Sequence, residues 1–222
     1  MKEEFRSVLA AWGVQLPAES LARVEAFEAA LREKNAVQNL VSRNDEPLLW
    51  ERHILDSLAA VPLLKRLLKP GGNAADAGSG AGFPGLVLAA VLPEFKFDLL
   101  DSRSKRCEFL TSAAAAMPCP NVEVAWRRVG EGGPGSERRY AAVTERAMGH
   151  LENILPQCLN ILSGGGSFLA WQSAAQLAGS RPDVEAALAK ARGEQVEDYR
   201  YRLPGETEDR HILVFRKKAQ RK

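Results

Sequence analysis

The stretch D-A-G-S-G-A-G-F-P-G, from Asp76 to Gly85, decides how this chain of 222 residues folds. It lies between a short apolar segment and a helix-like run over 86–92. Glycine permits positive φ in a tight turn between a strand and a helix, and it lets a ligand approach the bare backbone. The stretch is therefore typical of a loop that binds a nucleotide or cofactor in an open α/β sheet.

Two residues of the loop discriminate between cofactors. Residues 80–85 fit the dinucleotide fingerprint G-x-G-x-x-G, and Asp101 lies at about the right distance to hold a ribose. However, the Asp76 carboxylate would repel a pyrophosphate and attract an ammonium group, and Pro84 lacks a backbone N–H that would hold a phosphate. S-adenosylmethionine, which has an amino-acid head, a nucleoside and no phosphate, satisfies both conditions. An NAD-dependent oxidoreductase and a loop that serves only packing are the alternatives.

The pattern of apolar residues predicts a helical beginning. Leu21, Val24, Phe27 and Leu31 recur at helical spacing, and a second helical pattern covers 48–61. We expect a polar break over 35–43, and Pro70-Gly71-Gly72 ends the helical part. We therefore divide the chain into an N-terminal helical extension, residues 1–72, packed on a core domain of residues 73–222.

Strands and helices alternate after this extension. We expect strands over 74–77, 95–100, 122–126, 140–144 and 167–171, with helices over 86–92, 104–117, 151–162 and 183–191. Residues 196–203 and 211–215 flank the turn signal Pro204-Gly205-Glu206 and predict a hairpin. The order predicts an α/β fold with a doubly wound, mostly parallel, seven-stranded sheet whose last strand inserts antiparallel.

Composition and charge restrict the possible partners. The net charge is +2, but the basic residues cluster, which suits a phosphate-rich partner; the clusters are Arg127-Arg128, Arg138-Arg139, Arg200 with Arg202, and the C-terminal tail.

The three cysteines lie far apart, so we expect neither a metal site nor a disulfide framework. No stretch approaches the roughly 20 apolar residues of a membrane helix, and the beginning of the chain does not fit a signal peptide. We expect a cytoplasmic protein. Residues 130–136 are glycine-rich and predict a mobile loop.

Five motifs occur in the order and approximate spacing of one bacterial family. They are R-H-I-L-D-S-L (52–58), the glycine loop, L-L-D-S-R-S-K-R-C-E-F-L (99–110), T-E-R-A (144–147) and R-H-I-L-V-F (210–215). From about residue 35 onward the chain resembles the small-subunit ribosomal RNA guanine-N7 methyltransferases, also called glucose-inhibited division protein B. The resemblance implies the class I methyltransferase fold with S-adenosylmethionine as donor. It also implies N7 methylation of a guanine in 16S ribosomal RNA, near the decoding site of the small ribosomal subunit, and we expect a monomer.

The resemblance and the loop chemistry together suggest the site residues. We expect the cofactor to contact Asp76, Gly78, Gly80, Phe83, Asp101, Ser102, Val129, Gly130 and Arg146. The Asp101 carboxylate can accept hydrogen bonds from the ribose hydroxyls, and Phe83 offers an apolar wall. We expect RNA to contact Arg52, Arg128, Trp171 and Gln172, with Trp171 as a candidate for base stacking.

Guanine N7 carries a lone pair and no proton, so methyl transfer to it needs no general base. We therefore expect catalysis by positioning, with Arg128 and Arg146 orienting the substrate. His53 is expected to be a packed, hydrogen-bonded histidine with Asp56 as its partner. Trp126 could stack on adenine or on a flipped base, although aromatic residues at strand ends usually belong to the core.

Three positions depart from the common pattern of the family. Gln172-Ser173 stands where lysine and glycine are common, Gly130 stands where an acid is common, and Glu145 stands where a small residue is common. Glutamine lacks the positive charge of lysine, and Glu145 could partly neutralise Arg146. A cofactor-binding relative with weakened RNA methylation is therefore a further alternative.

Overall fold

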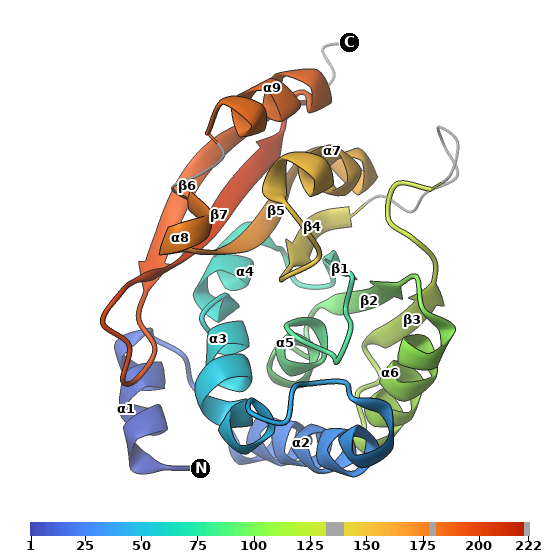
Figure 1. The fold of residues 1–222 in the computed structure, drawn as a ribbon, viewed down its shortest axis with the longest axis vertical. Helices are drawn as coiled ribbons and strands as arrows, with labels where there is room; N and C mark the ends of the chain where they lie inside the picture. The colour runs from blue at the N-terminus through green and yellow to red at the C-terminus, as the bar shows by residue number, and fades with distance from the viewer. Residues whose placement is uncertain (132–139, 178–180, 220–222) are drawn as a thin grey trace.

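Seven strands form one sheet at the centre of the molecule, in the order β3-β2-β1-β4-β5-β7-β6 (Figure 1). The computed structural model describes residues 1–131, 140–177 and 181–219. Neighbouring strands are parallel from β3 to β5, and β7 is antiparallel to both β5 and β6. The strands are β1 (Asn73–Ala77), β2 (Lys96–Asp101), β3 (Val122–Trp126), β4 (Tyr140–Glu145), β5 (Leu162–Ser173), β6 (Gly193–Tyr201) and β7 (Arg210–Lys217). This arrangement confirms the mostly parallel sheet with an inserted last strand and the terminal hairpin.

Helices cover both faces of the sheet. The first face carries α2 (Ala18–Gln38), α3 (Leu55–Leu58), α4 (Val61–Leu67), α5 (Gly85–Val91) and α6 (Ser104–Ala116), and the second carries α7 (Leu151–Ile161) and α9 (Arg181–Ala191). Helix α1 (Glu3–Ala11), the short turns η1 (Glu46–Leu48) and η2 (Trp50–Ile54), and α8 (Ala174–Leu177) complete the elements. Among the described residues, no helix combines the length and the apolar character that crossing a bilayer requires.

Two hydrophobic clusters form the core, one on each face of the sheet. Alternate residues of a strand belong to different clusters: Ala74 lies in the first and Ala75 in the second, and both are fully buried. Strand residues point alternately to opposite faces, so a central parallel strand is apolar on both. Burial on both sides therefore explains why β1 forms from an alanine-rich segment with low strand propensity.

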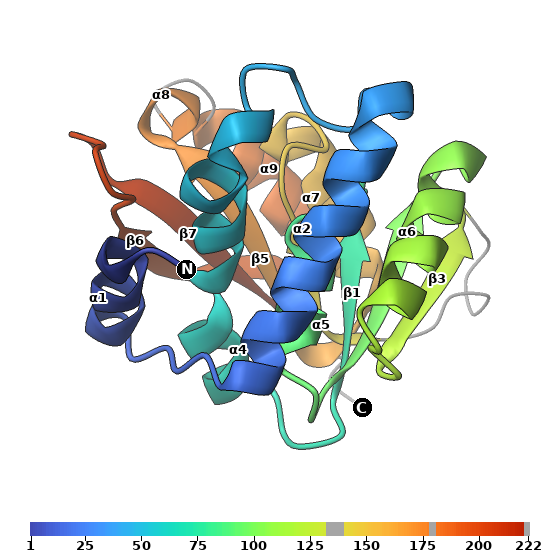
Figure 2. The ribbon, with the colours of Figure 1, turned by 90° about the horizontal axis from the view of Figure 1, so that it is seen from below.

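The N-terminal helices share the first cluster with the sheet. Helix α2 packs across α5 and α6 (Figure 2), and its Phe27 and Leu31 are fully buried. The polar break expected over 35–43 is present but begins later, because α2 continues to Gln38. The Asn35 side chain supports this last turn: its amide donates to Glu46 at 2.7 Å, and its oxygen accepts from the Val41 N–H at 2.9 Å.

Some sequence predictions fall outside the described residues. They concern the glycine-rich loop from residue 132 onward and four members of the basic clusters: Arg138, Arg139, Arg221 and Lys222.

Candidate active site

The glycine loop joins β1 to α5 at the carboxyl edge of the sheet. Gly78, Gly80 and Gly82 have φ values of 69°, 56° and 93°, a region that favours glycine. The Asp76 carboxylate lies beneath the loop, where it accepts the Gly85 N–H at 3.1 Å and the Thr144 hydroxyl at 2.8 Å. Complete burial raises the pKa of Asp76 to about 6. Asp76 therefore ties the loop to β4.

A first cavity of about 570 Å³ opens beside this loop, above the carboxyl ends of β1, β2 and β3. Five of the residues predicted from the sequence line it: Gly78, Asp101, Ser102, Arg128 and Val129. Among the lining residues, Asp101 is the only acidic one. The first cavity has the position at which open α/β sheets bind their ligands.

Asp101 is the most constrained residue of the first cavity. It is almost fully buried, and it accepts the Gly80 N–H at 2.9 Å and the Arg103 N–H at 2.8 Å. The Arg106 guanidinium lies 3.5 Å from the same carboxylate. Each carboxylate oxygen can accept about two hydrogen bonds and accepts one from a backbone N–H here, so lone pairs remain for the hydroxyls of a ribose. Gly80 does not line the cavity and acts on it through Asp101.

Three further residues predicted to touch the cofactor lie away from the first cavity. Asp76 is turned under the loop, so its carboxylate does not face the ligand space as we expected. Gly130 also lies outside the lining, but a Cβ there would approach Gln157, which does line the cavity, to 3.0 Å. Phe83 is buried, with its ring stacked on His53 at a centroid distance of 5.0 Å. It therefore supports a neighbouring site and does not form a wall of the first cavity.

That neighbouring site is a second cavity of about 420 Å³. It contains three of the four residues expected to contact RNA, together with Arg146; these four are Arg52, Arg146, Trp171 and Gln172. The fourth expected RNA contact, Arg128, lines the first cavity. Ala147, with a φ of 62°, lines both cavities, so the two meet directly after β4.

Asp56 organises the second cavity. Its carboxylate is 1% exposed and accepts hydrogen bonds from Arg146 at 2.7 Å, Tyr201 at 2.5 Å and Arg210 at 3.1 Å. The Arg210 guanidinium also pairs with Glu206 at 2.6 Å. Burial and the neighbouring Asp56 raise the pKa of Tyr201 well above its usual value, so this hydroxyl remains a donor.

His53 is packed and hydrogen-bonded, as predicted, but its partner is Arg146. The Nδ1 atom lies 2.8 Å from Arg146 Nη2 and accepts from it, because a guanidinium has only donors. Burial, and the Arg146 charge next, lower the pKa of His53 to about 4. The ring is therefore neutral and carries its hydrogen on Nε2. The predicted pairing of His53 with Asp56 is wrong, since Asp56 binds two arginines and a tyrosine instead.

The surroundings of β5 and β4 correct two more expectations. Trp171 is 5% exposed and its indole donates to the backbone oxygen of Asp56 at 3.0 Å, so little of its ring is left for stacking. Gln172 donates to the carbonyl of Trp171 at 2.7 Å. Glu145 accepts the Met148 N–H at 2.5 Å, while the carboxylate partner of Arg146 is Asp56.

Sequence reasoning missed several residues that line these cavities: Asp56 in this role, Arg103, Arg106, Met148, Asn153, Gln157, Tyr201 and Arg210. Arg103, Arg106, Asp56 and Arg210 lie within the quoted motifs, so position in a motif was an available signal. Met148, Asn153, Gln157 and Tyr201 carry no comparable signal, because only the fold brings them to the site.

Known proteins resemble this chain in both sequence and structure. The family model for rRNA small subunit methyltransferase G (GidB) matches residues 20–212. The chain is 34% identical over 212 residues to the ribosomal RNA small subunit methyltransferase G of Marinobacter nauticus, covering 95% of this chain and 92% of that protein. It is 38% identical over 168 residues to the protein of the same name from Sorangium cellulosum, covering 75% of this chain and 70% of that protein.

A solved structure supports the fold assignment. The S-adenosylmethionine-dependent O-methyltransferase of Thermotoga maritima has a TM-score of 0.56 and 21% sequence identity, over 82% of this chain and 73% of that chain. At this identity the likeness concerns the fold alone. The family model, however, spans most of the sequence, and with it both cavities. The chain therefore belongs to the rRNA small subunit methyltransferase G family.

Proposed function

We propose that this chain transfers a methyl group from S-adenosylmethionine to N7 of a guanine in 16S rRNA, with the cofactor in the first cavity and the guanine in the second. Family membership identifies the chain as an S-adenosylmethionine-dependent rRNA methyltransferase. The observation that carries the finer proposal is that the two cavities meet at Ala147. The target that the family suggests is guanine 527. We expect a monomer that acts in the cytoplasm on the small ribosomal subunit or its RNA.

The first cavity fits the cofactor by its chemistry. Asp101 offers carboxylate lone pairs to the ribose hydroxyls, and Val129 provides an apolar contact with backbone beside it. The absence of a side chain at Gly78 keeps the cavity open, since a Cβ there would lie 2.9 Å from Met148 Cγ. When bound, S-adenosylmethionine supplies a methyl group attached to a sulfonium.

In the second cavity, Arg146 would orient the guanine. Asp56 and His53 bind two nitrogens of its guanidinium, so the side chain is held in one position before RNA arrives. A fixed guanidinium suits the carbonyl of guanine or a neighbouring phosphate. N7 carries no proton, and the positive charge moves from sulfur to the purine, so the residues need only align donor and acceptor. Arg128, at the first cavity, is the second candidate for substrate positioning.

The structural details weaken both alternatives. Asp76 already occupies the Gly85 N–H at the beginning of α5, so this donor is not available to a pyrophosphate. This geometry argues against a dinucleotide. The suggestion that Glu145 neutralises Arg146 loses its support as well, because Glu145 binds the Met148 N–H. Gln172 and Ser173 remain as departures that line the second cavity, and the missing lysine charge at Gln172 is the one that favours weakened methylation.

The direct test is methyl transfer to 30S particles and 16S RNA from cells that lack this protein, followed by sequencing of the modified base. We expect 7-methylguanosine at one position, and stabilisation of the protein by S-adenosylhomocysteine but not by NADH. Stabilisation by NADH alone would reverse the assignment. If Gln172→Lys leaves an already full activity unchanged, the weakened relative is excluded.

A variant pair tests the position of the guanine. We expect Arg146→Ala to lower methyl transfer about 100-fold, because loss of orientation carries a cost of that size. Its affinity for S-adenosylhomocysteine should stay within about twofold, since Arg146 lines only the second cavity. Arg66→Ala, which removes a surface arginine paired with Glu197, is the control and should leave both quantities unchanged. A large loss of cofactor affinity in Arg146→Ala would contradict this placement.

A further inference from the structure

Trp126 is the one exposed aromatic residue of this chain. All phenylalanine, tyrosine and tryptophan residues lie in the described segments, and every other one is buried or partly buried. The Trp126 side chain is 70% exposed at the end of β3, the edge strand of the sheet. This exposure corrects the expectation that an aromatic residue at a strand end belongs to the core.

The exposed ring is nevertheless held in place beside the first cavity. Its indole N–H donates to the backbone oxygen of Ser102 at 3.0 Å, and Trp126 pairs with Asp101 in the register of β3 and β2. Ser102 and Asp101 both line the first cavity. The ring is therefore ordered before any ligand binds, which lowers the entropy cost of binding to it.

More arginines line the first cavity than the single carboxylate of the cofactor requires. Arg103, Arg106, Arg127 and Arg128 line it; Arg106 lies beside Asp101, the only acidic lining residue, and Arg128 pairs with Glu131 at 3.0 Å, so the other two arginines are the excess. S-adenosylmethionine carries an ammonium, a sulfonium and a single carboxylate, so its net charge is positive and additional cations nearby are unfavourable. A polyanion at the mouth of the cavity would offset this charge.

We propose that Trp126 and Arg103 form a docking platform for a single-stranded RNA segment that flanks the methylated guanine. One base of the segment stacks on the indole, and a phosphate beside that base pairs with the exposed Arg103 guanidinium, whereas Arg127 is turned inward toward the Tyr140 hydroxyl. A planar ring among cations is the arrangement that binds single-stranded nucleic acid, because stacking holds the bases while the cations hold the backbone. The platform rests on the proposed function and specifies how its substrate is held.

Substitution of the ring provides the first test, with a 16S RNA fragment that contains the target guanine. We expect Trp126→Ala to weaken RNA affinity and to raise KM for RNA about tenfold, the size of one lost stacking contact. The kcat at saturating RNA and the affinity for S-adenosylhomocysteine should not change. Trp126→Phe should restore most of the affinity, because it keeps a ring. Val37→Ala, which truncates another exposed apolar side chain on α2, is the control.

Fluorescence gives a readout that does not depend on catalysis. RNA binding should quench the tryptophan emission of the wild-type protein more strongly than that of Trp126→Phe, although that variant still binds RNA; Trp171, which lines the second cavity, is present in both proteins. If the quenching is equal in the two proteins, the base does not stack on this ring and the platform is refuted.

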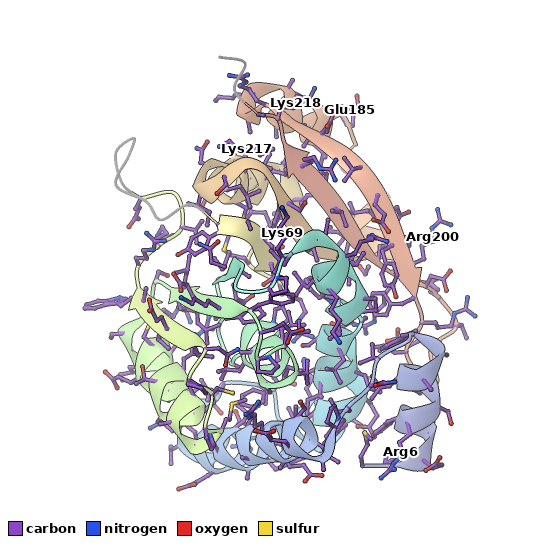
Figure 3. The ribbon with its side chains drawn as sticks, turned by 180° about the vertical axis from the view of Figure 1, so that it is seen from behind. Arg6, Lys69, Glu185, Arg200, Lys217 and Lys218 are labelled. Carbon is purple, nitrogen blue, oxygen red and sulfur yellow. The ribbon has the colours of Figure 1, made fainter. Side chains whose placement is uncertain are left out.

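The salt dependence of RNA affinity tests the contact between arginine and phosphate. We expect Arg103→Ala to reduce the slope of log affinity against log salt by about 0.7, the contribution of one phosphate on a single strand. Arg6→Ala is the charge-matched control, since Arg6 is exposed on α1, on the side of the molecule opposite β3 (Figure 3). An unchanged slope in Arg103→Ala would show that the Arg103 guanidinium does not contact a phosphate of the bound RNA.

The outcomes separate the platform from the proposed function. Wild-type protein that methylates 16S RNA, together with a Trp126→Ala variant that binds this RNA equally well, overturns the platform alone. Such a result would leave the exposed ring to a protein partner. Wild-type protein that binds this RNA but transfers no methyl group to it overturns the proposed function.

Discussion

Asp56 connects segments that lie far apart in the sequence through one buried carboxylate. Its acceptor atoms serve Arg146 after β4, Tyr201 at the end of β6 and Arg210 at the beginning of β7. Two guanidiniums share this one charge; Arg210 has Glu206 as a second carboxylate partner, whereas Asp56 is the carboxylate that pairs with Arg146. The position of Arg146, and with it the proposed guanine site, is therefore set by a residue that need not touch the substrate.

We expect Asp56→Ala to lower the free energy of unfolding by about 3 kcal/mol, because removal of one partner leaves charges buried without compensation. Urea unfolding at pH 7 measures this change. Asp209→Ala, which breaks the exposed pair between Asp209 and Arg202, is the matched control and should cost at most about 1 kcal/mol. Equal losses in the two variants would show that Asp56 has no special role.

The raised pKa of a single residue, Glu145, predicts that the stability of the protein depends on pH. Burial raises its pKa from 4.5 to about 7, so between these values the folded protein holds a proton that the unfolded chain has released. The contribution of Glu145 to stability is therefore complete below pH 4.5 and is lost as the pH rises through 7. Glutamine at this position does not titrate. We expect Glu145→Gln to gain about 2 kcal/mol of unfolding free energy relative to wild type between pH 5 and pH 8.

Comparing the variant with wild type at the same pH cancels the contributions of the other groups that titrate in this range. The raised pKa of Asp76, near 6, makes stability fall as the pH rises, as for Glu145, whereas the lowered pKa of His53 makes stability rise with pH. Both are present in the variant and in the wild type. Glu131→Gln, which makes the same substitution at an exposed position, is the control. A constant difference between Glu145→Gln and wild type from pH 5 to pH 8 would disprove the prediction.

The element that positions the cofactor is the turn from β1 into α5. Three glycines with positive φ bend the chain, and Asp76 binds the first N–H of the helix from below. Gly85 begins α5 against this carboxylate and against β2. The turn therefore needs glycine at Gly85 for reasons of space, and at Gly78, Gly80 and Gly82 for reasons of backbone conformation.

We expect Gly85→Ala to lower the free energy of unfolding by about 2 kcal/mol, although alanine is the better helix former. Its Cβ would overlap Leu99 and lie 2.6 Å from Asp76 Oδ2, and both of these side chains are buried. Gly164→Ala in β5 is the control, since its nearest contact would be an ordinary 3.5 Å. Calorimetry of the two variants decides the matter, and a Gly85→Ala protein as stable as wild type would contradict the packing argument.

At the scale of the whole molecule, the N-terminal helices and the sheet form one body with a common core. Phe27 of α2 packs against Phe83 of the glycine loop, with ring centroids 5.2 Å apart, and a Cβ at Gly82 would approach Phe27 to 3.0 Å. Helix α2 thus supports the loop from outside (Figure 2). The extension of residues 1–72 contributes to the same hydrophobic cluster as the strands.

We expect unfolding in one cooperative transition, with coincident curves from circular dichroism and tryptophan fluorescence. Phe27→Ala should shift both curves together and cost about 3–5 kcal/mol, the value for a large buried aromatic. Val37→Ala, which changes an exposed residue of the same helix, should shift neither. Two separate transitions would show that the extension folds independently of the sheet.

The features that the sequence predicted correctly are local in origin. Glycine spacing, strand length and the order of apolar segments depend on neighbouring residues, so the loop, the seven strands and the cofactor class followed from the sequence and its motifs. The sequence predictions were wrong where burial of a side chain determines the local structure. The break expected from residue 35 begins only after Gln38, because the buried Asn35 side chain finds hydrogen-bond partners at Glu46 and Val41. Trp171 lies buried and Trp126 exposed, contrary to expectation, because one strand is interior and the other is at the edge.

By itself, the sequence determined the glycine loop, the alternation of strands and helices, and the resemblance to a methyltransferase family, because periodicity and motif chemistry are carried by residues close together in the chain. Only the tertiary structure decided that Asp76 faces inward, that Asp56 holds Arg146 and Arg210, and that the two cavities meet at Ala147. The two contacts of Asp56 join residues that are 90 or more positions apart in the chain, and the packing of the whole molecule brings such pairs together.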